Sequence, residues 1–284
     1  MDPGQESVPV EDPMLQCASY ALELLSNGGL RRHVIGALVS SADIELLYYD
    51  RSIVVVSERI NFLHDHGRFF AMLHGMASLS RRQWGYETIL RPPRPPMPRH
   101  LSSSPVSSHL FDGYTFRLNI GETLVLGQTI HHQHGLIGRG TCVVRAEAAK
   151  PTIAGQDDNL VSNLANRPLI LKISWAATTR ARERELVGKA YSMATSADEH
   201  RWVLDHLPNI LHAEEIYNTD DSNQKGLLDL LGDKYEEREL RIVVQEELFP
   251  ITQLTTAADL AIALRGIFNC QLSPLYACLF CTQL

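Results

Sequence analysis

Apolar residues along the chain repeat with two different periods, which predict a mixture of helices and strands. Residues 15–26 and 68–80 carry apolar side chains three and four positions apart, the spacing of one helix face. Three β-branched or aromatic runs lie between them and are typical of strands: one from Val34, then 44–49 and 53–57. The pattern predicts a small α+β module over 15–90, with the second helix packed on the sheet.

Turn residues separate these elements. Asn27-Gly28-Gly29 follows the first helix, where glycine is a common helix terminator. Asp50-Arg51-Ser52 separates two strand-like runs and predicts a hairpin turn, although it lacks the Asn-Gly or Asp-Gly pair of the most secure hairpins. Residues 1–14 are acidic and proline-bearing, and we expect this N-terminus to be disordered.

A proline- and serine-rich linker over residues 91–113 divides the chain. It contains RPPRPPMPRHLSSSPVSSH, in which proline fixes φ and removes backbone donors, so its first half should be extended. An insertion loop between modules and a ligand for an aromatic-lined groove both fit this composition. Strand-like sequence returns from Tyr114 with YTFRLNI and ETLVLGQTI, which predicts a second unit.

Composition narrows the classes of function. The 284 residues are 44% hydrophobic and 21% charged, which is ordinary for a globular protein. The net charge of −7 gives no reason to expect nucleic acid or an anionic membrane as a partner. We find no signal peptide and no apolar run approaching the roughly 18 residues that cross a bilayer. The five scattered cysteines favour a reducing, intracellular setting, with cytoplasm and nucleus both open.

Three short clusters contain residue types that bind metals, but none of them predicts a metal site. They are His64-Asp65-His66, His131 to His134 with Cys142, and Cys278 with Cys281. A structural zinc site needs four ligands at fixed spacing, and each cluster lacks a suitable second pair. The first cluster is better explained as the polar start of a helix, and the second as exposed histidines at a strand end.

The stretch that carries chemistry begins at a glycine turn. Gly138 and Gly140 lie between two β-forming runs and can bring backbone N–H groups close to phosphate oxygens. Lys172 follows in LILKISW, on the strand face opposite its apolar neighbours, where a lysine needs an anionic partner. The next segment, RARERELVGKA, offers Glu183 and Glu185. On spacing alone, a phosphate-holding Lys–Glu pair and an ordinary amphipathic helix with solvated charges both remain open.

Several strings in order resemble the fungal-type protein kinase family. They are GLIGRGT, LKISW followed by R-x-x-E-x-E-L-x-x-K-A, HRWVLDHLPNIL and RELRIVVQEELFPITQL. Upstream, YALELLS, RRHVIGALV and YYDR resemble the region that precedes the kinase core in that family. The resemblance extends from about Gln16 to about Cys270.

The resemblance implies an α+β fold in which residues 114–270 form a kinase-like small lobe, a hinge and the first helix of the large lobe. The small lobe would be an antiparallel sheet with one main helix. Gly138 and Gly140 would cover the phosphates of ATP, and Lys172 would reach them. Glu183 would be the helix partner of the lysine, with Glu185 as the alternative.

The resemblance also implies a hinge at 245–248, in which the backbone of Glu246 and Leu248 would receive the adenine edge. Mg²⁺ would be bound only if ATP is bound. Val143 stands where a third glycine is expected in the loop, which puts nucleotide affinity in doubt. Two polar insertions are expected: about 151–168, a surface loop on the small lobe, and 218–238, which is acidic and expected to be mobile.

The catalytic half of a kinase is missing from the sequence. No His-Arg-Asp follows the hinge and no Asp-Phe-Gly occurs, so no catalytic or metal-binding residue is assigned. The resemblance fades near residue 270, and 271–284 is expected to be an atypical tail of a C-terminally truncated member. Two hypotheses remain: a catalytically incomplete kinase, and a pseudokinase-like interaction module with or without nucleotide. A nuclease-like fold over 15–80 ranks last because it lacks Asp with a following E-x-K.

The sequence further predicts an exposed apolar surface where a large lobe would normally rest. The helix that follows the hinge would expose a row of apolar side chains: Leu260, Ile262, Leu264 and Ile267. Such a patch favours a protein partner or aggregation.

Overall fold

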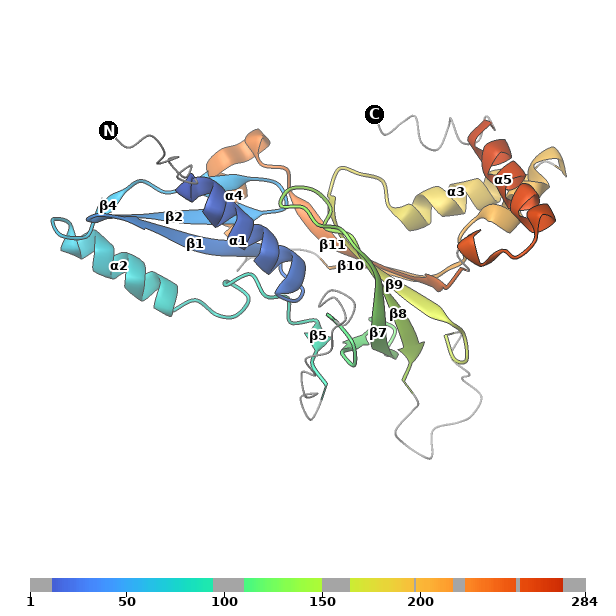
Figure 1. The fold of residues 1–284 in the computed structure, drawn as a ribbon, viewed down its shortest axis with the longest axis horizontal. Coiled ribbons are helices and arrows are strands. Elements are labelled where there is room, and N and C mark those ends of the chain that lie inside the picture. Colours follow the sequence, from blue (N-terminus) through green and yellow to red (C-terminus); the bar gives the residue numbers. More distant parts are fainter. Residues whose placement is uncertain are drawn as a thin grey trace, which may run out of the picture.

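The computed structural model describes residues 12–93, 110–149, 164–196, 198–216, 223–248 and 251–272. In these ranges the chain forms two antiparallel sheets with helices beside them. The smaller sheet, with α1 and α2, makes one end of the molecule (Figure 1). The larger sheet lies in the middle, and α3 and α5 make the other end. The predicted α+β class is therefore confirmed.

Some of the expectations fall on residues outside these ranges. They concern most of the N-terminal segment, the proline- and serine-rich stretch 94–109, most of the first polar insertion, and the tail from 273 onward with Cys278 and Cys281.

The smaller sheet is a meander with the order β1-β2-β3, to which a short fourth strand is added on β2. Its strands are β1 (His33–Ser40), β2 (Asp43–Asp50), β3 (Val54–Val56) and β4 (Ile60–Asn61). The carboxylate of Asp50 accepts hydrogen bonds from the backbone N–H groups of Ser52 (2.7 Å) and Ile53 (2.9 Å). This side-chain turn replaces the missing Asn-Gly pair and explains the predicted hairpin between β2 and β3.

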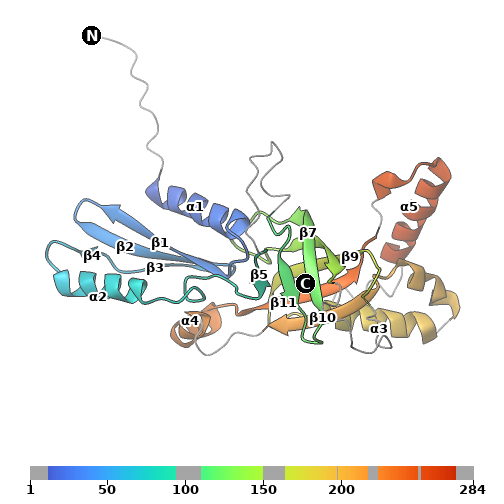
Figure 2. The same ribbon diagram turned by 90° about the horizontal axis from the view of Figure 1, so that it is seen from below.

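Helix α1 (Pro13–Asn27) covers one side of this sheet (Figure 2). Asp12 caps its first turn by accepting from the Met14 N–H, and Pro13 fits the first helical position. The helix buries Ala21 and Leu25 in a small core with three residues of the strands: Val34, Leu47 and Tyr49. The helix therefore holds its place by an amphipathic face, as its spacing predicted.

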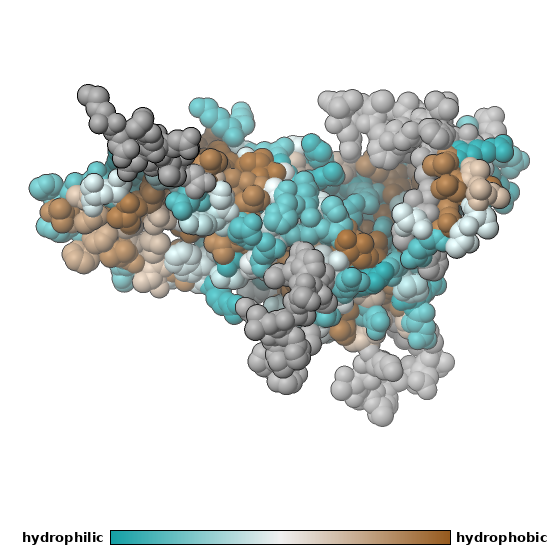
Figure 3. Space-filling view, viewed as in Figure 1, coloured by the Kyte–Doolittle hydropathy of each residue, from teal (hydrophilic) through white to brown (hydrophobic). Residues whose placement is uncertain are grey.

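Helix α2 (His66–Ala77) lies along the other side of the smaller sheet (Figure 2). Asp65 caps it by accepting from the Arg68 N–H, so the His64-Asp65-His66 cluster is a helix start, as predicted. None of its residues is buried, and Phe70 is 64% exposed. Brown, apolar side chains gather at this end of the molecule (Figure 3). The expected burial of this helix against the sheet is not found.

The larger sheet has seven strands in the order β10-β11-β9-β8-β7-β6-β5. The strands are β5 (Leu90–Arg91), β6 (Thr115–Arg117), β7 (Thr123–His132), β8 (Cys142–Ala148), β9 (Leu169–Ala177), β10 (Ile210–Ile216) and β11 (Arg238–Glu246). Strand β5 comes from the end of the predicted first module, and Leu90 belongs to the core of this sheet. The helices nearby are α3 (Glu183–Ser196), α4 (Asn223–Leu231) and α5 (Ala257–Leu272).

Side chains alternate along β9 and divide the larger sheet into two faces. Leu171, Ile173 and Trp175 are buried in the main core, whereas Lys172 and Ser174 point to the opposite face. The same alternation in β11 sends three apolar residues into the core: Leu240, Ile242 and Val244. Each such side chain contributes roughly 1.5–3 kcal/mol by leaving water. The core face stabilises the sheet and leaves the other face for α3.

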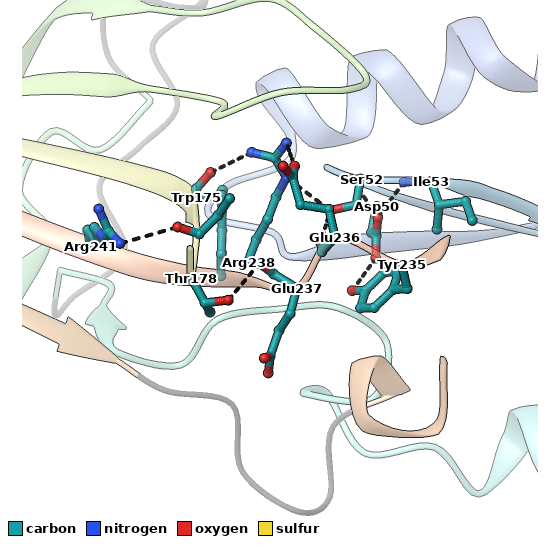
Figure 4. Close-up of polar contacts among 11 residues, drawn as sticks. Asp50, Ser52, Ile53, Trp175, Thr178, Tyr235, Glu236, Glu237, Arg238 and Arg241 are labelled. Atoms are coloured by element: carbon teal, nitrogen blue, oxygen red, sulfur yellow. Dashed lines mark hydrogen bonds and ion pairs between the residues drawn. The ribbon is translucent and has the colours of Figure 1, made fainter. Parts of the chain in front are cut away.

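A buried polar network joins the two sheets at the Asp50 turn (Figure 4). Asp50 is fully buried and accepts from the hydroxyl of Tyr235 at 2.8 Å. Arg238, the first residue of β11, donates to the Ser52 hydroxyl (2.9 Å) and to the Trp175 carbonyl (3.1 Å). A second buried link is Arg32, whose guanidinium pairs with Glu87 and stacks over the Trp175 ring at 4.9 Å.

The acidic insertion over 218–238, which was expected to be mobile, contains a helix and buried side chains in its described part. Residues 223–231 form α4, Gln224 is buried and accepts from Arg32 (3.1 Å), and Tyr235 is 4% exposed. The polar composition suggested a solvated loop, but these polar side chains have partners in a distant part of the chain.

We expect Tyr235→Phe to destabilise the protein by about 1–2 kcal/mol, because it removes a buried hydrogen bond to a carboxylate without changing shape. The free energy of unfolding in urea measures the effect. The matched control is Tyr20→Phe, since Tyr20 is 60% exposed and should change stability little. Equal losses in the two variants would show that the Asp50 contact does not stabilise the junction.

Stability should also fall as pH decreases from 6.5 toward 4, because of His33. Burial lowers the pKa of His33 from 6.5 to about 4, and its Nε2 donates to the Gln83 carbonyl at 2.8 Å. The unfolded chain therefore binds the proton first, and the stability present above pH 6.5 is lost at up to about 1.4 kcal/mol per pH unit. Urea unfolding at pH 7.5 and 5 measures the loss. An NMR titration that places the His33 pKa near 6.5 would refute this cause.

Candidate functional site

Lys172 lies in the middle of the sheet face that is turned away from the core. In the register it stands between Val143 of β8 and Val243 of β11. Its side chain is 27% exposed. A lysine at this place on a central strand is flanked by apolar residues, so its charge has to be met from another element.

Glu183 provides that charge. Its Oε2 lies 2.6 Å from the Lys172 Nζ, and it is the first residue of α3. Glu185 instead contacts Arg182 at 3.4 Å. Acidic residues in the first turn of a helix are favoured by the helix dipole, which helps α3 to begin here. Of the two glutamates considered from the sequence, the structure pairs Glu183 with the lysine.

A cavity of about 340 Å³ lies between α3 and this face of the sheet. Small-molecule sites usually range from about 300 to 1,000 Å³, so the volume is at the low end. Its lining includes apolar residues: Leu186, Val187, Ala190, Leu207, Pro208 and Val243. It also includes charged residues: Arg139, Lys172, Arg180, Arg182 and Arg241, with Glu183 and Glu215. Cationic groups outnumber carboxylates, which favours an anionic ligand with an apolar portion.

Arg241 fixes the backbone that leads into α3. Its Nε donates to buried Glu239 at 2.8 Å, and its two terminal nitrogens donate to three carbonyls: Ala177 (3.2 Å), Arg180 (2.6 Å) and Ala181 (3.0 Å). These bonds hold the start of α3 over the sheet and thereby set the position of Glu183. No sequence motif singled out Arg241; its alternation with the apolar residues of β11 was the available signal.

The glycine turn between β7 and β8 packs against the first module. Gly138 and Gly140 both have positive φ, +118° and +51°. The Gly138 N–H donates to the Arg51 carbonyl at 2.8 Å, and the Arg51 Nη1 donates to the Gly135 carbonyl at 2.6 Å. A Cβ on Gly140 would lie 2.5 Å from the Arg51 guanidinium carbon. The two glycines do not line the cavity, whereas Arg139 between them does.

The segment predicted as a hinge lies farther along the same sheet. Glu246 is three positions from the residue that pairs with Lys172, an offset of about 10 Å. Its carboxylate accepts from Asn209 (2.9 Å) and Arg167 (2.6 Å), which lower its pKa. The Glu246 and Glu247 N–H groups donate to carbonyls of Asn209 and Pro168, and Leu248 is 65% exposed. Neither Glu246 nor Leu248 lines the cavity.

The described ranges contain no group of three His, Cys, Asp or Glu side chains that could hold a metal ion. Cys142 is a core residue, and burial raises the pKa of its thiol to about 12, so it does not complement the nearby histidines. Among the helices described, none has the length and apolarity needed to cross a membrane.

The comparison with protein families agrees with this architecture. A family model described as fungal protein kinase matches residues 4–266. The match covers most of the 284 residues and includes both sheets, so the chain belongs to the fungal protein kinase family. The resemblance stated from the sequence motifs is confirmed. No curated protein and no solved structure matches the chain.

Gly140→Ala should destabilise the protein by at least about 2 kcal/mol. The new Cβ would meet the Arg51 guanidinium, and the positive φ costs an L-residue about 1–2 kcal/mol. Gly127→Ala is the matched control, because its Cβ would make ordinary contacts at 3.8 Å. Urea unfolding of both variants measures the difference. An unchanged midpoint for Gly140→Ala would show that the loop does not pack on Arg51 in solution.

Proposed function

We propose that this chain binds the phosphate groups of a nucleotide at Lys172 and does not transfer them. In this proposal the larger sheet and α3 are the small lobe of a kinase, the end of β11 is the hinge, and α5 is the first helix of the large lobe. The family membership supports the kinase-like assignment in general.

One observation carries the proposal: the Lys172–Glu183 pair at 2.6 Å, which joins a central strand to the neighbouring helix beside a cationic cavity. In protein kinases such a pair holds the lysine where it reaches the α- and β-phosphates. The pair is partly exposed, so it adds only about 0–1 kcal/mol to stability. A role in ligand binding explains its position better than a role in folding.

The cavity fits phosphate better than a magnesium ion. Its carboxylates, Glu183 and Glu215, both lie within ion-pair distance of a cation. The sequence holds neither His-Arg-Asp nor Asp-Phe-Gly, which supply the base and the metal ligand for phosphoryl transfer. Binding without transfer is therefore the form of kinase-like function that we propose for these 284 residues.

The alternative is an interaction module with a protein partner. Two observations favour it. The glycine turn is engaged by Arg51, and three apolar side chains in the described part of α5 are exposed: Leu260 (41%), Ile262 (68%) and Leu264 (40%). The side chain of Ile267 lies outside the described part. In this alternative, α5 docks the partner and nucleotide is dispensable.

ATP should raise the free energy of unfolding of the full chain by about 2.7 kcal/mol at 100 times its Kd. Lys172→Ala should weaken ATP binding about tenfold or more, because a charge-assisted contact to phosphate is lost. Calorimetric titration measures both Kd values. Lys189→Ala, an exposed position on α3, is the matched control and should leave the Kd unchanged. Absence of any ATP binding would refute the proposal and leave the interaction module.

A further inference from the structure

Backbone groups of the glycine turn already form hydrogen bonds within the protein. The Gly138 N–H donates to Arg51, and the Gly135 carbonyl accepts from the same residue. Arg51 is 4% exposed and also donates to the Leu25 carbonyl of α1 at 2.9 Å. The turn is thus held from both the first helix and the Asp50 hairpin. A phosphate that approached the Gly138 N–H would have to displace a buried contact.

One residue of the turn, Arg139, instead lines the cavity. The Arg139 carbonyl accepts from the Trp175 N–H at 2.7 Å, which attaches the top of the turn to β9. Trp175 lies three positions from Lys172 on that strand, an offset of about 10 Å. From there Arg139 lines the same cavity as Lys172. Glycines on either side, both with positive φ, give the turn this sharp course.

The charges of the cavity are unevenly balanced. Arg241 pairs with Glu239, Arg182 with Glu215, and Lys172 with Glu183. Arg139 and Arg180 line the cavity too, and in the part of the chain that the structure describes neither guanidinium has a carboxylate partner. Two unbalanced guanidinium groups beside a lysine favour a ligand with several negative charges. Guanidinium groups bind phosphate through two parallel hydrogen bonds, which gives them an advantage over point charges.

The geometry points to Arg139 as a phosphate-binding residue, whose side chain takes the place of the backbone N–H groups of the glycine turn. The ligand class is an anion with two or more linked phosphate groups, such as a nucleoside triphosphate or inorganic tripolyphosphate. The inference rests on the proposed function, since it extends the phosphate site at Lys172. The inference goes beyond the proposed function because it assigns the contact between the glycine turn and phosphate to the side chain of Arg139.

The test is calorimetric titration of the full chain with ATP and with tripolyphosphate, each at one fixed salt concentration. Arg139→Ala should weaken tripolyphosphate binding about tenfold or more, and Arg139→Lys should restore only part of it. Arg117→Ala is the matched control: it removes an equal charge from an exposed position on β6, at the far part of the sheet. Circular dichroism confirms that each variant is folded.

The outcomes separate this inference from the proposed function. Tripolyphosphate binding that depends on Arg139, without ATP binding, would support the inference and refute the nucleotide proposal. ATP binding that depends on Lys172 but is equal in Arg139→Ala and Arg117→Ala would overturn the inference alone. Failure of the unaltered chain to bind either compound would overturn both. If Arg139→Ala weakens the binding of both ATP and tripolyphosphate, and Arg117→Ala binds both as the unaltered chain does, the inference and the proposed function are both supported.

Discussion

The structure depends most on the buried turn from Asp50 to Ser52. A carboxylate that leaves water is costly unless donors surround it, and here the donors come from its own hairpin and from Tyr235. Arg51 and Arg238 then join the turn to the glycine stretch and to β9. None of these groups can be left buried without its partners. The two sheets are therefore expected to fold cooperatively, although each has its own apolar core.

Two arginines give the candidate site its shape. Arg51 determines the course of the turn that carries Arg139, and Arg241 holds the backbone that leads into α3. The site is thus assembled from three elements by two side chains to which no direct part in binding is assigned, although Arg241 also lines the cavity. This division between residues that position and residues that bind explains why Lys172 and Glu183 meet across a strand and a helix.

The sequence predicted well those features that depend on local pattern. Helical spacing located α1, strand alternation placed Lys172 opposite the core, and the motif order identified the family. The features it missed depend on partners far apart in the chain. Tyr235 and Asp50 are separated by 185 positions, and no periodicity in either segment predicts their contact. The polar composition of residues 223–238 hid their folding, because Tyr235 and Gln224 are satisfied by Asp50 and Arg32 rather than by neighbours. The role of Arg51 was hidden for the same reason, since a turn residue is ordinarily solvated.

Strand β5 has a practical consequence for anyone who divides this chain at its proline-rich stretch. Leu90 and Arg91 pair with Phe116 and Thr115 of β6, which lie on the far side of that stretch. A cut there would leave one fragment with an apolar residue stripped of its core and the other with an open sheet edge. The change in composition along the sequence therefore does not coincide with a boundary between structural units. Fragments divided there would tend to associate with each other or to precipitate.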